Sequence, residues 1–216
     1  HPTQCMHPGQ QLLRSSAVSD DGVCGLAASY RFRLGDGGRV AGREALRLRV
    51  EPLDMYRFGY VFELDRDTAL MLKATTMSSD QRVLEQFQFA SLSMDGAPVG
   101  DATIEHRAGH PHPEDGGSPG AGPRWRVSWL PDGFLPTDAS HRQAPRKSFT
   151  DGFASFSVFL EPLATAIKPG EGVERQGSTV AYTRGVMLDN TPVLVTVLGE
   201  IPTNTARMVA DSVRLN

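Results

Sequence analysis

The sequence has few cysteines and few aromatic residues, and it lacks the long apolar stretch of a membrane-spanning helix. Two of its 216 residues are cysteines, and aromatic residues make up 7% of the chain. No run approaches the roughly 20 consecutive apolar residues of a transmembrane helix, and the opening "HPTQCMHPGQ" lacks the basic start and apolar middle of a signal peptide. The formal net charge of -3 gives no basic field for nucleic acid. We therefore expect a globular protein that binds no nucleic acid, and a chain without an initiator methionine suggests a processed or trimmed product.

The signature motifs of common enzyme classes are missing as well. The chain contains no G-x-S-x-G elbow, no phosphate-binding G-x-x-x-x-G-K-[ST], no H-E-x-x-H and no C-x-x-C. Each motif places a nucleophile, a phosphate cradle or metal ligands at a fixed spacing, so the usual anchors of hydrolases, nucleotide-binding enzymes, zinc proteases and thioredoxin-like enzymes are lost. We predict that the protein is not an enzyme and uses no cofactor.

Three short clusters carry metal-ligating side chains, but none has the arrangement of a stable site. The histidine cluster lies among glycines and prolines, which leave it too loosely held, and the aspartate pair lacks the later glycine and glutamate of a calcium loop. We predict no metal at these clusters, which are His110 and His112 with Glu114 and Asp115, Cys5 with His7, and Asp65 with Asp67.

The two cysteines, Cys5 and Cys24, both lie near the start of the sequence. A bond between them would close a loop of roughly 20 residues, stabilise the fold by about 3 kcal/mol if unstrained, and indicate an oxidising compartment. Two unrelated reduced thiols fit the same residues equally well. Composition alone leaves the pairing and the compartment open.

Residues 26–92 show the two-residue alternation of apolar and polar side chains that is typical of antiparallel strands. In "SYRFRL" and "ALRLRV" the apolar residues take one face and arginines take the other, while the glycines of "GDGGRVAGRE" suit a turn or bulge. "GYVFELDRDTALMLKATT" is typical of a hairpin, and "RVLEQFQFASLSM" of a further strand. The pattern predicts one sheet with an apolar face and an arginine-bearing face.

The apolar face of this sheet allows two interpretations. It is an ordinary core, or, if the sheet curves around it, the lining of a lipid-sized cavity. Under the second interpretation the lipid-facing residues are Tyr30, Phe32, Leu46, Leu48, Tyr60, Phe62, Phe87 and Phe89.

The stretch 95–123 is dense in glycine and proline and poor in large apolar residues, so it buries too little surface to offset its ordering entropy. We predict a flexible linker there, between one domain in residues 1–94 and a second in residues 124–216. Trp125 and Trp129 follow the linker directly and share one face of an extended strand. We expect them to begin the sheet of the second domain.

Three later stretches, "DGFASFSVFLEP", "STVAYTRGVML" and "TPVLVTVLGEI", predict more strands, and the last is apolar on both faces like a central strand covered by a helix. The expected helix lies in "IPTNTARMVADSVRLN", with Thr203 or Asn204 as its N-cap. Apolar residues then recur at helical spacing, namely Ala206, Val209, Ala210 and Val213. The predicted fold class is α+β, mainly antiparallel β, with a C-terminal helix on one face of the second sheet.

A basic stretch, "SHRQAPRKSF", follows the tryptophans. Its cations suit an acidic peptide or lipid headgroups, although a solvated loop explains them too, and the tryptophans also suit a core. The candidate partner-binding residues are Trp125, Trp129 and Phe134 as apolar anchors, and His141, Arg142, Arg146 and Lys147 as polar or charged contacts.

Six stretches, taken together and in this order, resemble the MucB/RseB family of periplasmic sigma-E regulators: "GLAASYRFRL", "RVAGREA", "YVFELDRDTALMLK", "VLEQFQFA", "WLPDGF" and "DGFASFSVFLEP". The combination is much more specific than any one stretch. The resemblance implies a half-barrel similar to the lipoprotein carrier LolA, followed by a smaller antiparallel domain, both in the periplasm. It also favours pairing of Cys5 with Cys24, because the periplasm is oxidising.

The function that the resemblance implies is regulatory. The family binds the periplasmic segment of a membrane-spanning anti-sigma factor, shields it from regulatory proteolysis and releases it when envelope lipids accumulate. The implied partners are that segment and lipid or lipopolysaccharide fragments, and the sequence leaves open a homodimer. The alternative is a periplasmic lipid or lipoprotein carrier. Family members have a run of strands before the region matching "HPTQC", so we expect an incomplete half-barrel here.

Limited proteolysis tests the predicted domain division. We expect the first cuts within residues 95–123, because a segment without a packed core is the most accessible to a protease. The fragments are identified by mass spectrometry at early times. Resistance of this segment beside rapid cleavage elsewhere would contradict the division.

Overall fold

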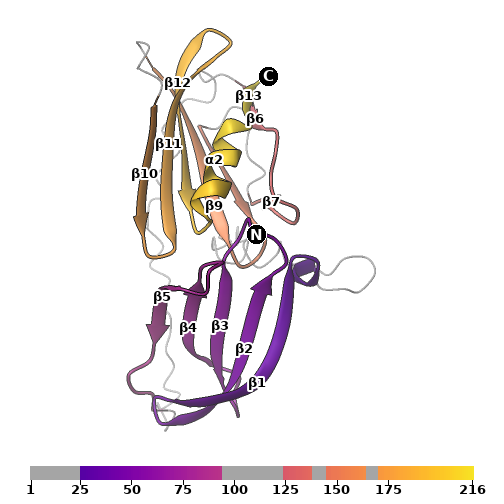
Figure 1. Ribbon diagram of the computed structural model, residues 1–216, viewed down its shortest axis with the longest axis vertical. Coiled ribbons are helices and arrows are strands. Elements are labelled where there is room, and N and C mark those ends of the chain that lie inside the picture. The colour runs from indigo at the N-terminus through magenta and orange to yellow at the C-terminus, as the bar shows by residue number, and fades with distance from the viewer. Residues whose placement is uncertain (1–24, 94–123, 138–144, 164–169) are drawn as a thin grey trace, which may run out of the picture.

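The computed structural model describes residues 25–93, 124–137, 145–163 and 170–216, and it places two antiparallel sheets end to end along the long axis (Figure 1). The first sheet follows a short 3-10 turn, η1 (Gly25–Ala28), and has the strand order of the chain. Its strands are β1 (Tyr30–Val40), β2 (Arg43–Pro52), β3 (Gly59–Asp65), β4 (Met71–Met77) and β5 (Val83–Gln88).

The register of the first sheet confirms the two faces predicted from the alternation. Phe32 pairs with Val50 and Leu34 pairs with Leu48, so apolar side chains of neighbouring strands stand together on one face. Arg33 pairs with Arg49 on the other face. The arginines therefore line the opposite side of the sheet from the aromatic residues.

The second sheet has six strands in the order β10, β11, β12, β9, β8, β7. It is larger than the first, whereas we expected a smaller second sheet. Its strands are β7 (Leu135–Pro136), β8 (Arg146–Thr150), β9 (Ser155–Pro162), β10 (Gly170–Gln176), β11 (Thr179–Leu188) and β12 (Thr191–Gly199).

The tryptophan stretch does not begin this sheet, contrary to our expectation. Strand β6 (Trp125–Val127) pairs with β13 (Val213–Leu215) in a separate two-stranded ribbon, and Trp129 lies beyond the end of β6. The alternation in the sequence indicates a strand, but the partner of that strand comes from the distant C-terminal residues. Short-range periodicity carries no information on that pairing.

The C-terminal helix α2 (Thr203–Asp211) is present, but both of its ends differ from those predicted. Pro202 is the N-cap residue, in place of Thr203 or Asn204. At the other end, the backbone N–H and the hydroxyl of Ser212 both donate to the Val209 carbonyl, after which the chain enters β13. Val213 is buried, but it belongs to strand β13 and not to the helix. Its match to the helical spacing of Ala206, Val209 and Ala210 is a coincidence.

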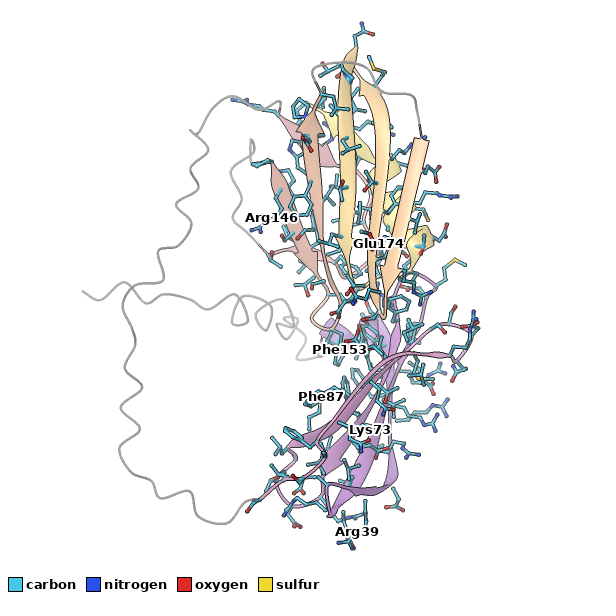
Figure 2. The ribbon with its side chains drawn as sticks, turned by 90° about the vertical axis from the view of Figure 1, so that its left-hand side faces the viewer. Arg39, Lys73, Phe87, Arg146, Phe153 and Glu174 are labelled. Atoms are coloured by element: carbon cyan, nitrogen blue, oxygen red, sulfur yellow. The ribbon has the colours of Figure 1, made fainter. Side chains whose placement is uncertain are left out.

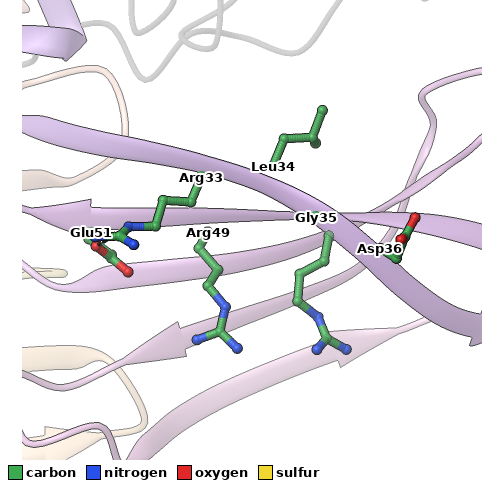
Figure 3. A pocket seen from close by; sticks show the side chains of 7 residues that line it. Arg33, Leu34, Gly35, Asp36, Arg49 and Glu51 are labelled. Atoms are coloured by element: carbon green, nitrogen blue, oxygen red, sulfur yellow. Dashed lines mark hydrogen bonds and ion pairs between the residues drawn. The ribbon is translucent and has the colours of Figure 1, made fainter.

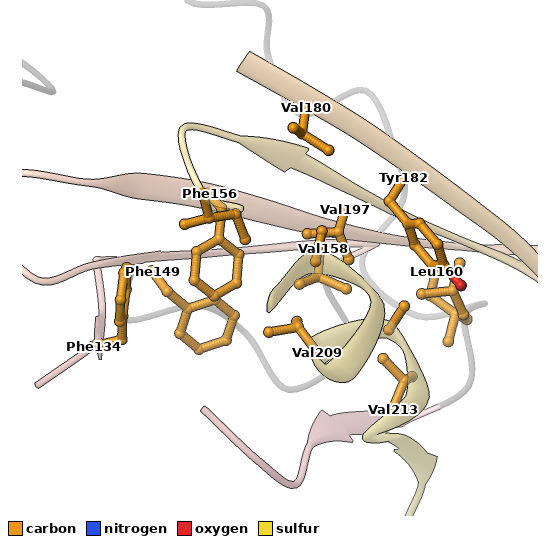
Figure 4. Packing of buried hydrophobic residues seen from close by; sticks show 14 of the residues in the cluster. Phe134, Phe149, Phe156, Val158, Leu160, Val180, Tyr182, Val197, Val209 and Val213 are labelled. Carbon is orange, nitrogen blue, oxygen red and sulfur yellow. The ribbon is translucent and has the colours of Figure 1, made fainter. Parts of the chain in front are cut away.

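Helix α2 covers one face of the second sheet and completes the main core (Figure 4). Alternate residues of the central strand β12, Val193, Val195 and Val197, are all buried beneath it. Aromatic side chains from β8, from β9 and from the turn before β7 pack together at one end of this core, where the ring centroids of Phe149 and Phe156 are 5.3 Å apart. Burial of this cluster provides most of the apolar stabilisation in the described residues.

Neither membrane-spanning helices nor metal clusters occur in the part of the chain that the structure describes. Helix α2 has nine residues, and no described helix is long and apolar enough to cross a bilayer. No described set of three or more His, Cys, Asp or Glu side chains is placed to hold a metal ion. The histidine cluster and Cys5 with His7 lie outside the described residues, whereas Asp65 accepts hydrogen bonds from Arg43 and Thr68.

Candidate functional site at the junction of the two sheets

The two sheets meet around a buried arginine. Arg57, in the loop between β2 and β3, has a side chain with 0% of its surface exposed. Its Nη1 donates to the carboxylate of Asp151 at 2.7 Å, across 94 residues of sequence. Its Nε donates to Asp54 at 3.1 Å, and its Nη2 donates to the backbone carbonyl of Asp132. One guanidinium thus joins the first sheet to two loops of the second.

Asp151 is satisfied on both carboxylate oxygens. Besides Arg57, Oδ2 accepts a hydrogen bond from the Tyr30 hydroxyl at 2.8 Å. Oδ1 accepts the backbone N–H groups of Phe153 at 3.0 Å and Ala154 at 2.8 Å, which fixes the turn between β8 and β9. A buried charge is tolerated only with such complete pairing.

The protonation states of the junction follow from burial and from the neighbouring charges. Burial, with the adjacent Asp151 carboxylate, raises the pKa of the Tyr30 hydroxyl, so the tyrosine remains a donor. Burial disfavours the charge of Arg57, but the hydrogen bond to Asp54 and the charge of Asp151 outweigh it and raise the pKa of the guanidinium. The network is therefore a charged pair with a neutral phenol.

Phe153 extends the junction into the apolar face of the first sheet. From the turn after β8, its ring lies 5.2 Å from that of Tyr30 and 5.4 Å from that of Tyr60, measured between centroids. Phe32 and Phe62 lie 6.2 and 6.0 Å away. Figure 2 shows Phe153 where the two sheets meet. A side chain of the second sheet thus occupies one end of the first sheet's apolar face.

Smaller contacts flank this centre. The Tyr56 and Trp129 rings meet edge to face at 5.3 Å, and the Thr205 hydroxyl of α2 donates to the Tyr56 carbonyl at 3.0 Å. On the far side, the Ser178 hydroxyl donates to Glu85 at 2.7 Å. The contacts on both flanks restrict rotation of one sheet against the other.

The residues predicted to face lipid fall into three groups by their exposure. Tyr30 and Tyr60 are buried in the junction. Away from it the same face is open: Phe32 is 38% and Phe87 53% exposed, and Leu34 beside them is 67% exposed. The half-buried members of the set are Leu46, Leu48, Phe62 and Phe89.

The residues predicted to bind a partner also differ in their exposure. Trp125 and Phe134 are buried in the core of the second sheet and offer little surface in this conformation. Trp129 is half-buried at the junction. Arg146 is exposed at the start of β8, and next to it the Lys147 amine lies 5.1 Å from the centre of the Trp125 ring.

Four predicted residues lie outside the described residues: His141 and Arg142 of the basic stretch, and the cysteines Cys5 and Cys24. The basic stretch is described only from residue 145 onward. The disulfide and the first half of the basic patch stay predictions.

Sequence patterns did not indicate the three central residues, Arg57, Asp151 and Phe153. Asp151 and Phe153 lie in "DGFASFSVFLEP", whose Asp-Gly pair indicates a turn but not the partner of the carboxylate. Arg57 stands in "MYRFGY" between two strands, where an arginine is ordinarily exposed. Only the packing of the two sheets assigns these residues to one site.

The fold and the junction define a mainly antiparallel β-protein with two sheets fastened by a buried polar network. Family models agree with this class: residues 7–108 match the MucB/RseB N-terminal domain, and residues 120–214 match the MucB/RseB C-terminal domain. The chain belongs to the MucB/RseB family.

Individual relatives support the same assignment. The sigma factor AlgU regulatory protein MucB of Pseudomonas aeruginosa is 39% identical over 199 residues, covering 88% of this chain and 62% of the relative. The sigma-E factor regulatory protein RseB of Salmonella typhimurium is 28% identical over 200 residues, covering 88% of this chain and 60% of the relative. The chain thus spans about three fifths of the length of these curated relatives.

Two solved complexes have a similar structure. The crystal structure of MucB in complex with MucA(peri) superposes with a TM-score of 0.72 at 37% identity, covering 88% of this chain and 69% of the other. The complex of Pseudomonas aeruginosa MucA and MucB gives a TM-score of 0.73 at 34% identity, covering 99% and 73%. Each contains a MucB protein bound to MucA.

Replacing Asp151 by asparagine tests the central role of the buried pair. We expect Asp151→Asn to lower the free energy of unfolding by about 3 kcal/mol, because it leaves the Arg57 guanidinium buried without its closest counter-charge. Urea denaturation measures the change. The matched control is Glu171→Gln, which neutralises the ion pair that Glu171 makes with Arg207 at 2.9 Å on the surface, and should leave the urea midpoint unchanged. Equal effects of the two substitutions would contradict the role of the junction.

Proposed function

We propose that this protein is a periplasmic, non-catalytic regulator that binds the periplasmic segment of a membrane-bound anti-sigma factor and shields it from regulatory proteolysis. The observation that carries the proposal is the likeness to MucB bound to MucA(peri), over 88% of this chain. The regulatory names of the curated relatives support the same function. The periplasmic location follows from the location of such a partner.

A partner that shields a flexible segment needs a surface of fixed shape. The buried Arg57–Asp151 pair and the inserted Phe153 hold the two sheets together, so the surface on either side of their junction is pre-organised. We place the bound segment along the junction and the adjoining edge of the second sheet. Trp129 there supplies apolar contact, and Arg146 and Lys147, with His141 and Arg142, supply charge.

We further propose that the first sheet is part of a LolA-like half-barrel and that lipid binding to its apolar face causes release. Exposed apolar side chains on that face, including Phe32 and Phe87, support this idea, because an acyl chain covering them gains about 0.8 kcal/mol per buried methylene. Lipid or lipopolysaccharide fragments are the proposed ligands.

Phe153 provides the link between lipid and partner. Its ring occupies the end of the apolar face, against Tyr30 and Tyr60, and its own backbone N–H is held by Asp151. An acyl chain that extends along the face competes with this ring. Displacement of Phe153 pulls on the turn that holds Asp151, and so weakens the network that fixes the two sheets.

The same apolar face favours a second candidate function, that of a lipid or lipoprotein carrier for which any regulatory contact is secondary. Native mass spectrometry after gentle purification separates the two functions when combined with a partner-binding assay. A carrier retains lipid and does not protect the anti-sigma factor, whereas the regulator protects it.

A protease-protection assay tests the regulatory function. We expect the intact protein to slow cleavage of the anti-sigma factor's periplasmic domain by its regulatory protease. Charge reversals at Arg142, Arg146 and Lys147, each made singly, should weaken protection several-fold, because a reversed charge repels an acidic segment.

The control for these variants is Arg175→Glu, on the exposed strand β10 at the opposite edge of the second sheet. It should protect as well as the unmodified chain. If the intact protein does not slow cleavage of the anti-sigma factor, the regulatory function is contradicted. If all three variants protect normally, only the role of the basic patch is contradicted.

The substitution Phe153→Ala tests the lipid link. Removing the ring exposes the end of the apolar face, so we expect tighter binding of a fluorescent fatty acid, together with weaker protection of the anti-sigma factor. Met187→Ala, a truncation of an exposed apolar side chain on β11, away from the proposed binding surface, is the control. Fatty-acid binding that is unaltered by Phe153→Ala would contradict the link.

A further inference from the structure

The arginine-bearing face of the first sheet contains an open pocket of about 370 Å³, on the side opposite the apolar face (Figure 3). Its lining includes Arg33 and Gly35 of β1, and Arg47, Arg49 and Glu51 of β2. Figure 3 shows Leu34 pointing away from Arg49. The pocket is therefore built from the polar side chains of two neighbouring strands.

The hollow exists because residue 35 has no side chain. Gly35 pairs with Arg47 in the middle of β1, and its backbone is not in the left-handed region that requires glycine. A Cβ atom at this position would meet nothing within 4 Å. Neither backbone strain nor packing requires glycine here, and a glycine inside a strand costs roughly 0.5–1 kcal/mol relative to alanine. Its effect is to leave space between the arginines, as glycines do where a ligand approaches a strand.

The arrangement of charges around the hollow also destabilises the sheet. Arg33 and Arg49 pair directly across β1 and β2, and like charges in that position destabilise a sheet. Glu51 binds Arg33 at 3.1 Å, and Glu63 binds Arg47 at 2.7 Å. Arg49 makes no ion pair or hydrogen bond with any described residue, and its exposed guanidinium lies beside the hollow. One cation is thus left without a counter-charge.

We infer that Arg49, with Arg33 and Arg47 beside it, binds an Asp or Glu side chain of a polypeptide partner. A carboxylate carries the single charge that one unpaired guanidinium neutralises, and it accepts two parallel N–H donors. A phosphate dianion would bring a second charge close to Glu51 and Asp36, which also line the pocket.

The open shape of the pocket favours an acid that is part of a longer chain. Small free ligands need a site that encloses most of their surface, whereas a side chain is positioned by the remainder of its polypeptide. The inference rests on the proposed function, since the polypeptide is then the anti-sigma factor's segment. It adds a contact on the flank of the first sheet, separate from the junction and from the basic stretch.

Isothermal titration calorimetry with the full chain and the anti-sigma factor's purified periplasmic domain tests this inference. We expect Arg49→Gln to weaken the Kd by about tenfold, the effect of losing one charge-assisted pair. Gly35→Leu, which fills the hollow and leaves every charge in place, should weaken it similarly. Arg49→Lys retains the charge without the bidentate geometry and should recover part of the affinity.

Arg175→Gln is the control for a surface cation elsewhere, and thermal unfolding checks that each variant is folded. Wild-type binding that persists unchanged in both Arg49→Gln and Gly35→Leu overturns the pocket and leaves the proposed function standing. No binding by the wild-type chain overturns the proposed function and the pocket together. A third outcome is that the periplasmic domain binds all variants equally, while phosphatidylglycerol vesicles bind the wild type and not Arg49→Gln. In that case the occupant of the pocket is a lipid headgroup and the inference is wrong.

Discussion

The arrangement of this protein depends on one buried ion pair, Arg57 with Asp151. Two charges withdrawn from water are stable only if every donor and acceptor is paired, and here Tyr30, Asp54 and three backbone groups complete the set. Because the partners come from both sheets, neither sheet satisfies the network alone. The need to pair these buried donors and acceptors, more than the burial of apolar area, determines how the sheets meet.

That constraint explains why the first sheet has an unusual apolar face. The second sheet and α2 enclose the main apolar core between them. The first sheet has only small buried clusters, around Tyr30 and around Leu72, and much of its aromatic face stays accessible. Phe153 covers one end of this face and leaves the rest accessible. A sheet stabilised at its junction tolerates an open face that an isolated sheet would have to cover.

The two faces of the first sheet then have different proposed partners, acyl chains on the aromatic side and a carboxylate on the arginine side. β-strand geometry separates them, since successive side chains point to opposite faces. In these proposals, a ligand on the aromatic side acts on Phe153 and the junction, whereas a carboxylate at Arg49 adds affinity without contacting the network. The two proposals thereby assign binding strength and its regulation by lipid to different residues of the first sheet.

Short-range alternation and local motifs were enough to predict the strands of the first sheet and its two faces, strands β9, β11 and β12 of the second sheet, the C-terminal helix and the family. They did not indicate β7, β8, β10 or β13. The same information misplaced the Trp125 strand and the ends of α2, since the pairing of β6 with β13 joins residues about 90 apart. It did not indicate the junction either. Arg57 and Asp151 look like ordinary exposed charges in sequence, and the hollow at Gly35 looks like an ordinary turn glycine. The burial of Arg57 and Asp151 and the unpaired state of Arg49 among the described residues follow from the tertiary structure, which brings distant side chains within hydrogen-bonding distance and excludes water from some of them.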